Sequence, residues 1–144
     1  MQASFRFSMT SLPLTLKRAF QILAQTSAKA ASITEAEVLL LAHFFALPST
    51  FEFHRFSRSA RVAVQKEYAR LYGEEISMAN IQAKLHSMKK KGFIIKQDDG
   101  QLVAVPYIKE FAGQVFKAYN ENKEFTFLFS FSASEEKRDS NRGI

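Results

Sequence analysis

The segment from Ser77 to Val105 constrains the fold more than any other part of the sequence. Ser77 is a favourable helix N-cap, and apolar residues follow it at the spacing of one buried helix face: Ile81, Leu85 and Met88. Gly92 ends this pattern, and two strand-like runs then flank Asp99-Gly100. An Asp-Gly pair in that setting is typical of a β-hairpin with a type I′ turn, which needs positive φ at both central residues. The sequence predicts a helix over 78–91 followed by a hairpin.

Two more helices are predicted before this segment. Thr34 and Glu37 have the spacing of a capping box, and the residues that follow are apolar almost all round, so we expect a buried central helix that ends before Pro48. A second helix over 58–72 carries an apolar face formed by Ala60, Val64, Tyr68 and Leu71. Gly73 suits the left-handed position just after a helix. The predicted order is therefore three helices and a hairpin.

The flanks add helices and two Phe-rich strands. Residues 3–9 alternate, which predicts a strand with Phe5, Phe7 and Met9 on one side, and residues 125–131 alternate in the same way with Phe125, Phe127, Phe129 and Phe131. We expect a helix after Pro13 that fades into the linker 27–32, and another over 107–122. The predicted segments are 1–32 (strand and helix), 33–106 (the helix and hairpin domain), 107–132 (helix and strand) and 133–144 (a polar tail).

The run from Ser77 to Val105, preceded by a basic helix and a Gly-containing turn, resembles the recognition helix and wing of the winged helix-turn-helix family. MarR-like regulators and phage replication or regulatory proteins have this pattern, and the resemblance covers about residues 34–105. It implies a mainly α fold with a small β part, here with extra terminal helices and Phe-rich flanking strands. It also implies a protein that binds double-stranded DNA, with the third helix in the major groove.

The excess positive charge lies in one part of the chain. Of the net charge of +6, a balance of +7 lies between His54 and Lys96, where ten Lys and Arg accompany three Glu, and the rest of the chain is close to neutral. A localised basic segment is typical of a phosphate-binding face. A solvated basic surface with no ligand is the alternative interpretation.

If the family's mode of binding applies, the amides of Asn80 and Gln82 would face adenine edges, and lysines near the end of the helix, Lys91 among them, would lie close to phosphates. The full set of expected DNA contacts is Arg55, Arg58, Arg61, Ser77, Asn80, Gln82, Lys84, Lys89 and Lys90. Some of these residues also have a simpler interpretation: Asn80 as a solvated first-turn residue, the lysines at the end of the helix as cations at its C-terminus, and the arginines of the second helix as partners of nearby glutamates.

Two features favour a second hypothesis, a structural or adaptor protein such as a phage particle component. The hairpin tip carries Asp98 and Asp99, which phosphates would repel. The Phe-rich strands either pair with each other or cover the core, or they form an interface in a homodimer or larger assembly. Base stacking on these rings is disfavoured, because residues 125–132 contain no basic side chain.

No pattern of catalytic chemistry is found. The chain has no cysteine, its three histidines (His43, His54 and His86) lack metal-ligand spacing, and it has neither a phosphate-binding Gly-rich loop nor a nucleophile elbow. His43 is expected to be a core or rim residue. We expect no enzymatic activity, cofactor, metal or small-molecule substrate. With no apolar run long enough for a membrane span and no signal peptide, we expect a cytoplasmic protein, in the host cell or the virion if phage-encoded.

Overall fold

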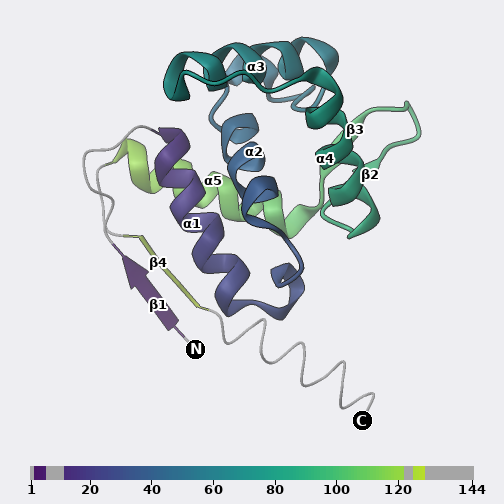
Figure 1. The fold of residues 1–144 in the computed structure, drawn as a ribbon. Helices are drawn as coiled ribbons and strands as arrows, with labels where there is room; N and C mark the ends of the chain where they lie inside the picture. The colour runs from purple at the N-terminus through teal and green to yellow at the C-terminus, as the bar shows by residue number, and fades with distance from the viewer. Residues whose placement is uncertain (1, 6–11, 122–124, 129–144) are drawn as a thin grey trace.

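The computed structural model describes residues 2–5, 12–121 and 125–128, and helix α2 (Glu35–Phe45) is its central element. The expected capping box is confirmed: the Thr34 hydroxyl accepts from the Glu37 amide, and the Glu37 carboxylate accepts from the Thr34 amide at 2.8 Å. The core residues of α2 include Leu41, Ala42 and Phe44, which are fully buried. The other helices surround α2 in Figure 1. The prediction of a buried central helix is therefore confirmed.

Helices α3 (Arg58–Tyr72) and α4 (Met78–Lys90) form as the sequence predicts. Ser57 caps α3, Ser77 caps α4, and Gly73 has a φ of 67° where the chain turns between them. Ala60 and Val64 on the expected apolar face are buried, whereas Leu71 on the same face is 36 % exposed. Leu71 lies in the last turn of α3, beyond the part of that helix whose side chains are buried.

The hairpin consists of β2 (Ile94–Lys96) and β3 (Leu102–Ala104), paired antiparallel with Ile95 opposite Val103. Its turn differs from the expected one. The Gly100 amide donates to the Gln97 carbonyl, so Asp98 and Asp99 are the central residues of the turn. Gly100 follows with a φ of 87°, the arrangement of a longer hairpin loop in which a single residue needs positive φ. The Asp-Gly pair therefore sits one position later than the type I′ prediction puts it.

Helices α1 (Leu12–Thr26) and α5 (Pro106–Asn120) complete the core. Pro106 occupies the first turn of α5, where its missing amide costs no hydrogen bond, so it begins this helix as well as ending the hairpin. The residues expected to form a linker contain a short 3₁₀ helix, η1 (Ala28–Ala30). One continuous apolar core extends from Leu16 in α1 to Ala118 in α5.

The two Phe-rich flanks pair with each other. Strand β1 (Gln2–Phe5) runs antiparallel to β4 (Phe125–Leu128), with Phe5 opposite Phe125 and Ala3 opposite Phe127. Figure 1 shows the two strands together at the edge of the molecule. The expected pairing of the flanks is confirmed for these residues, while Phe7, Phe129 and Phe131 lie outside the described residues. The fold is thus mainly α-helical with two small antiparallel sheets.

Candidate nucleic-acid interface

Helix α4 has an exposed outer face that carries no carboxylate. Its inner residues Ile81, Leu85 and Met88 are buried against the core, as the sequence predicts. The exposed residues opposite them are named here the outer face of α4: Ala79, Gln82, Ala83, His86, Lys89 and Lys90. Neither Asp nor Glu occurs in this helix. The outer face therefore combines cations with amide and imidazole groups that can form hydrogen bonds.

The two amides expected to face DNA bases do not share this face. Each residue of an α-helix is rotated by about 100° from the last, so Asn80 and Gln82 point roughly 160° apart. Asn80 lies on the flank that also carries the partly buried Lys84, and its backbone amide donates to the Ser77 hydroxyl at 3.0 Å. Gln82 lies on the outer face one turn before His86. His86 was missing from the predicted contacts, although its spacing from Gln82 could have found it.

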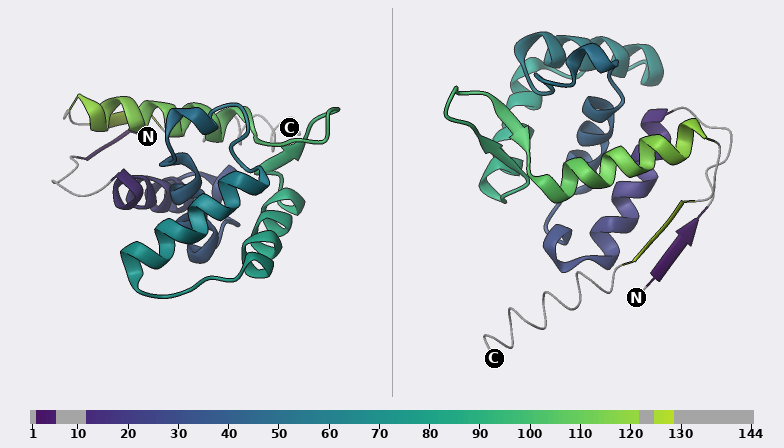
Figure 2. Two further views of the ribbon diagram at one scale, coloured as in Figure 1. Left: turned by 90° about the horizontal axis from the view of Figure 1, so that it is seen from above. Right: turned by 180° about the vertical axis from the view of Figure 1, so that it is seen from behind.

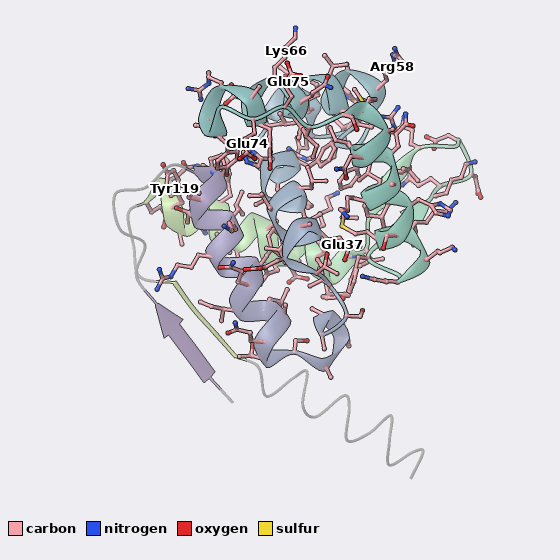
Figure 3. The ribbon with its side chains drawn as sticks, in the orientation of Figure 1. Glu37, Arg58, Lys66, Glu74, Glu75 and Tyr119 are labelled. Atoms are coloured by element: carbon pink, nitrogen blue, oxygen red, sulfur yellow. The ribbon has the colours of Figure 1, made fainter. Side chains whose placement is uncertain are left out.

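The three consecutive lysines at the end of α4 have different environments. Lys89 and Lys90 are exposed. Lys91 instead extends toward α2, where its ammonium lies 2.7 Å from Oε1 of Glu37 and 2.9 Å from the Ser32 carbonyl. Figure 3 shows Glu37 between α2 and α4. The expectation that Lys91 lies at a phosphate-facing surface is therefore wrong, because a buried carboxylate 54 residues away in the sequence binds it.

The environment of Glu37 favours its ionised form. Burial alone would raise the pKa of this carboxyl, but hydrogen bonds from Lys91, Ser87 and the Thr34 amide outweigh burial and lower the pKa below 4.5. The side chain is only 1 % exposed. A charged carboxylate at this depth requires its cation, so the Glu37–Lys91 pair belongs to the fold and not to a ligand site.

The three arginines expected at the interface have separate locations. Arg58 is exposed at the start of α3, and Figure 3 shows it on the outer side of that helix together with Lys66. Arg61 is partly buried and donates from Nη1 to the Phe56 carbonyl at 3.3 Å. Arg55 lies in the loop before α3 and donates from Nη1 to the carbonyls of Phe44 and Leu47. Only Arg58 of the three is fully available to a ligand near α4.

The hairpin tip is exposed and acidic, as the sequence predicts. Asp98 and Asp99 are both exposed, and the Asp99 carboxylate accepts from the Gln101 amide at 2.9 Å. This local hydrogen bond gives Asp99 a role in the turn itself. The tip nevertheless presents two negative charges to solvent, opposite in sign to the outer face of α4.

Histidine 43 belongs to the core, as expected. It is 2 % exposed, and its Nε2 atom lies 3.0 Å from the Tyr72 hydroxyl, which joins α2 to α3. Within the described ranges, no group of three or more metal-binding side chains comes together. No helix in those ranges is both long and apolar enough to cross a membrane.

Comparison with protein-family models, curated proteins and solved structures gives no match.

Proposed function

We propose that this chain is a winged-helix protein that binds double-stranded DNA through the outer face of α4. The observation that carries the proposal is the composition of this face: Gln82, His86, Lys89 and Lys90 are exposed on a helix that has no carboxylate. A helix of this width enters the major groove, where a glutamine amide can form two hydrogen bonds to adenine. The order α2, α3, α4 and hairpin β2–β3 is compatible with a helix-turn-helix followed by a wing.

The residues divide into two roles in this proposal. Lys89, Lys90 and Arg58 contact phosphates and supply most of the affinity, because each neutralised phosphate releases counterions. Gln82 and His86 face the bases and supply sequence preference. The amide of Gln82 has no hydrogen-bond partner within the part of the chain that the structure describes, so binding would not break an existing interaction. Lys91 has no role in this interface, because the buried Glu37 carboxylate binds it. Arg55 has none because its guanidinium is directed toward the carbonyls of Phe44 and Leu47 at the end of α2.

The test compares two double variants that lose the same charge from different places. Lys89→Gln with Lys90→Gln alters the outer face, and Arg18→Gln with Lys117→Gln alters exposed positions on α1 and α5. Fluorescence anisotropy with a random 30-base-pair duplex would measure affinity from low to moderate salt. We expect the affinity of the first variant for DNA to fall at least about tenfold. The slope of log affinity against log salt concentration should become shallower by about 1.8, since each phosphate contact contributes about 0.9.

The DNA affinity of the control variant should stay within about threefold of that of the unmodified protein, because only its net charge is lower. Equal weakening of both variants would show that α4 is not the binding face. Absence of binding by the unmodified chain at low salt would overturn DNA binding altogether. Selection from a random duplex library should further show that Gln82→Ala relaxes sequence preference while the affinity for random DNA stays the same.

The second candidate function is a non-catalytic adaptor that uses the same fold for protein contacts. The observation that favours it is the exposed acidic hairpin tip at Asp98 and Asp99. An adaptor of this kind would bind a basic protein surface with the hairpin, and Asp98→Asn with Asp99→Asn would abolish that contact. In a DNA-binding protein the same variant would leave the DNA affinity unchanged or raise it. An adaptor would lose its protein partner in this variant, and the unmodified chain would not bind DNA in the titration.

A further inference from the structure

A second surface feature lies on α5, away from the outer face of α4. It is an open cavity of about 270 Å³ between the loop before α3, strand β3 and α5. In the left panel of Figure 2, α5 runs along the upper side of the molecule and α4 lies at the lower right. We call this cavity the α5 pocket. Its walls are mainly apolar and include Leu47, Phe56, Val103 and Ala112.

The pocket is large enough for one aromatic or large aliphatic side chain. An engineered apolar cavity of about 150 Å³ binds benzene, so the α5 pocket has room for a ring and its link to a backbone. Two phenylalanines at the rim extend the apolar surface outward: Phe53 is 82 % exposed and Phe116 is 40 % exposed. A ligand that only filled the cavity would leave Phe53 in water. The rim therefore favours a polypeptide over a small molecule.

Gly113 gives an independent sign that the pocket has an occupant. It lies inside α5, where glycine costs about 1 kcal/mol relative to alanine. A Cβ atom built on Gly113 meets no atom within 4 Å apart from the neighbouring backbone of its own helix, so packing inside the fold does not require glycine. Since Gly113 lines the pocket, a side chain at this position would occupy its space. The glycine keeps the pocket open at a cost to the helix.

The charges around the pocket define the second property of the occupant. Arg55 and Lys109 line it together with a single carboxylate, Glu52. The Arg55 guanidinium lies 5.3 Å from the centre of the Phe45 ring and has no carboxylate within ion-pair distance among the described residues. Burial lowers the pKa of Arg55, and the attraction of Glu52 opposes that change only in part. A partly buried cation without a direct counter-ion favours an acidic ligand.

We propose that the α5 pocket binds a peptide segment of a partner protein in which an aromatic or large aliphatic residue is next to an acidic residue. The apolar side chain enters the pocket above Gly113. The carboxylate lies between Arg55 and Lys109. Nη1 of Arg55 already donates to the carbonyls of Phe44 and Leu47, so its Nε and Nη2 groups form the two parallel hydrogen bonds to the carboxylate. The rim rings Phe53 and Phe116 cover the peptide backbone on either side. This contact leaves the outer face of α4 free.

The test is a selection from a phage-displayed library of random dodecapeptides, carried out on the full chain. Counter-selection uses Gly113→Leu, which fills the pocket, and the affinity of each enriched synthetic peptide is then measured by fluorescence polarisation. We expect peptides that combine an apolar anchor with Asp or Glu, and at least a tenfold loss of affinity for Gly113→Leu. Lys109→Glu is a second variant, at an exposed position without a described ion pair, and should cause a similar loss.

Lys117→Glu is the matched control, because it makes the same charge change at an exposed position of α5 outside the pocket. The affinity of Lys117→Glu for the enriched peptides should stay within twofold of that of the unmodified chain. The proposal is wrong if no peptide is enriched over the Gly113→Leu background, if enriched peptides lack acidic residues, or if Lys109→Glu and Lys117→Glu weaken binding equally. Because Gly113 is exposed, melting curves of Gly113→Leu should show a folded protein, and Lys109→Glu decides the matter if they do not.

Discussion

The ammonium group of Lys91 at the end of α4 lies 2.7 Å from the carboxylate of Glu37 in the first turn of α2. The same oxygen of Glu37 accepts from the Thr34 amide at 2.8 Å. One buried carboxylate thus completes the cap of the central helix and holds the end of the helix that carries the proposed DNA-binding face. The pair therefore adds a polar contact between α4 and α2 to the packing of the buried Ile81, Leu85 and Met88.

The first prediction concerns the stability that this pair provides. Lys91→Met leaves Glu37 buried without its cation, and we expect a loss of about 1–3 kcal/mol in the free energy of unfolding. Lys90→Met is the matched control, since Lys90 is exposed, and should change stability by less than about 0.5 kcal/mol. Urea unfolding measures both. Equal effects of the two substitutions would contradict a structural role for Lys91.

The second prediction concerns pH. The folded state lowers the pKa of Glu37, so its contribution to stability is complete above the ordinary value of 4.5 and is lost as the pH falls through the lowered value. The stability difference between the unmodified chain and Glu37→Gln should therefore be largest near neutral pH and shrink in acid. Urea unfolding of both proteins between about pH 3 and 7 measures it. A difference that is constant over that range would rule out this linkage.

The third prediction concerns His43 and Tyr72. Burial lowers the pKa of His43, against a smaller opposing effect of Glu67, so the folded state binds a proton less readily than the unfolded chain. Stability should accordingly decrease as the pH falls below 6.5 and His43 is protonated in the unfolded state, and a titration of its ring protons by NMR should give a value below 6.5. An NMR value at or above 6.5 would contradict this.

A related substitution tests the hydrogen bond itself. Tyr72→Phe removes the hydroxyl 3.0 Å from Nε2 of His43 and should cost about 0.5–1.5 kcal/mol. Tyr68→Phe, at the neighbouring ring of the same cluster, removes a hydroxyl that has no hydrogen bond to described residues and should be nearly neutral. Thermal unfolding distinguishes the two. A larger loss for Tyr68→Phe would mean that ring packing, not the hydrogen bond, is what matters.

The fourth prediction compares two glycines with opposite expected effects. Gly73 has a φ of 67°, so Gly73→Ala should destabilise the protein by about 1 kcal/mol. Gly113 lies in regular helix with open space around it, so Gly113→Ala should stabilise the protein by about 0.5–1 kcal/mol. Thermal or urea unfolding of both variants checks the signs. Destabilisation by Gly113→Ala would indicate a steric need for glycine within the fold.

Features encoded by neighbouring residues were predictable from the sequence. The caps at Thr34 and Ser77 depend on residues three positions away, and the turn at Gly73 depends on one residue's conformation. The hairpin was predicted but its turn was misplaced, because Asp98-Asp99-Gly100 allows more than one turn type and the strand register decides between them. Local rules therefore located the elements and left the register open.

Features that depend on distant residues could not be predicted in this way. Arg55 binds carbonyls at the end of α2, and Lys91 binds a carboxylate near the start of α2. Neither partner can be identified from the charges that neighbour Arg55 or Lys91 in the sequence. The placement of Asn80 and Gln82 on different faces of α4 could have been predicted, since it follows from helical periodicity alone. The α5 pocket is formed by a loop, a strand and a helix that are distant in the sequence, so it could not be predicted from local patterns.

The separate environments of Lys89, Lys90 and Lys91 affect how mutational experiments on this chain are interpreted. A triple replacement of the run would remove two surface charges and one internal cation together. Partial unfolding of such a variant would then be mistaken for lost DNA contacts. Lys89 and Lys90 report on the surface, and Lys91 reports on the integrity of the protein that carries it.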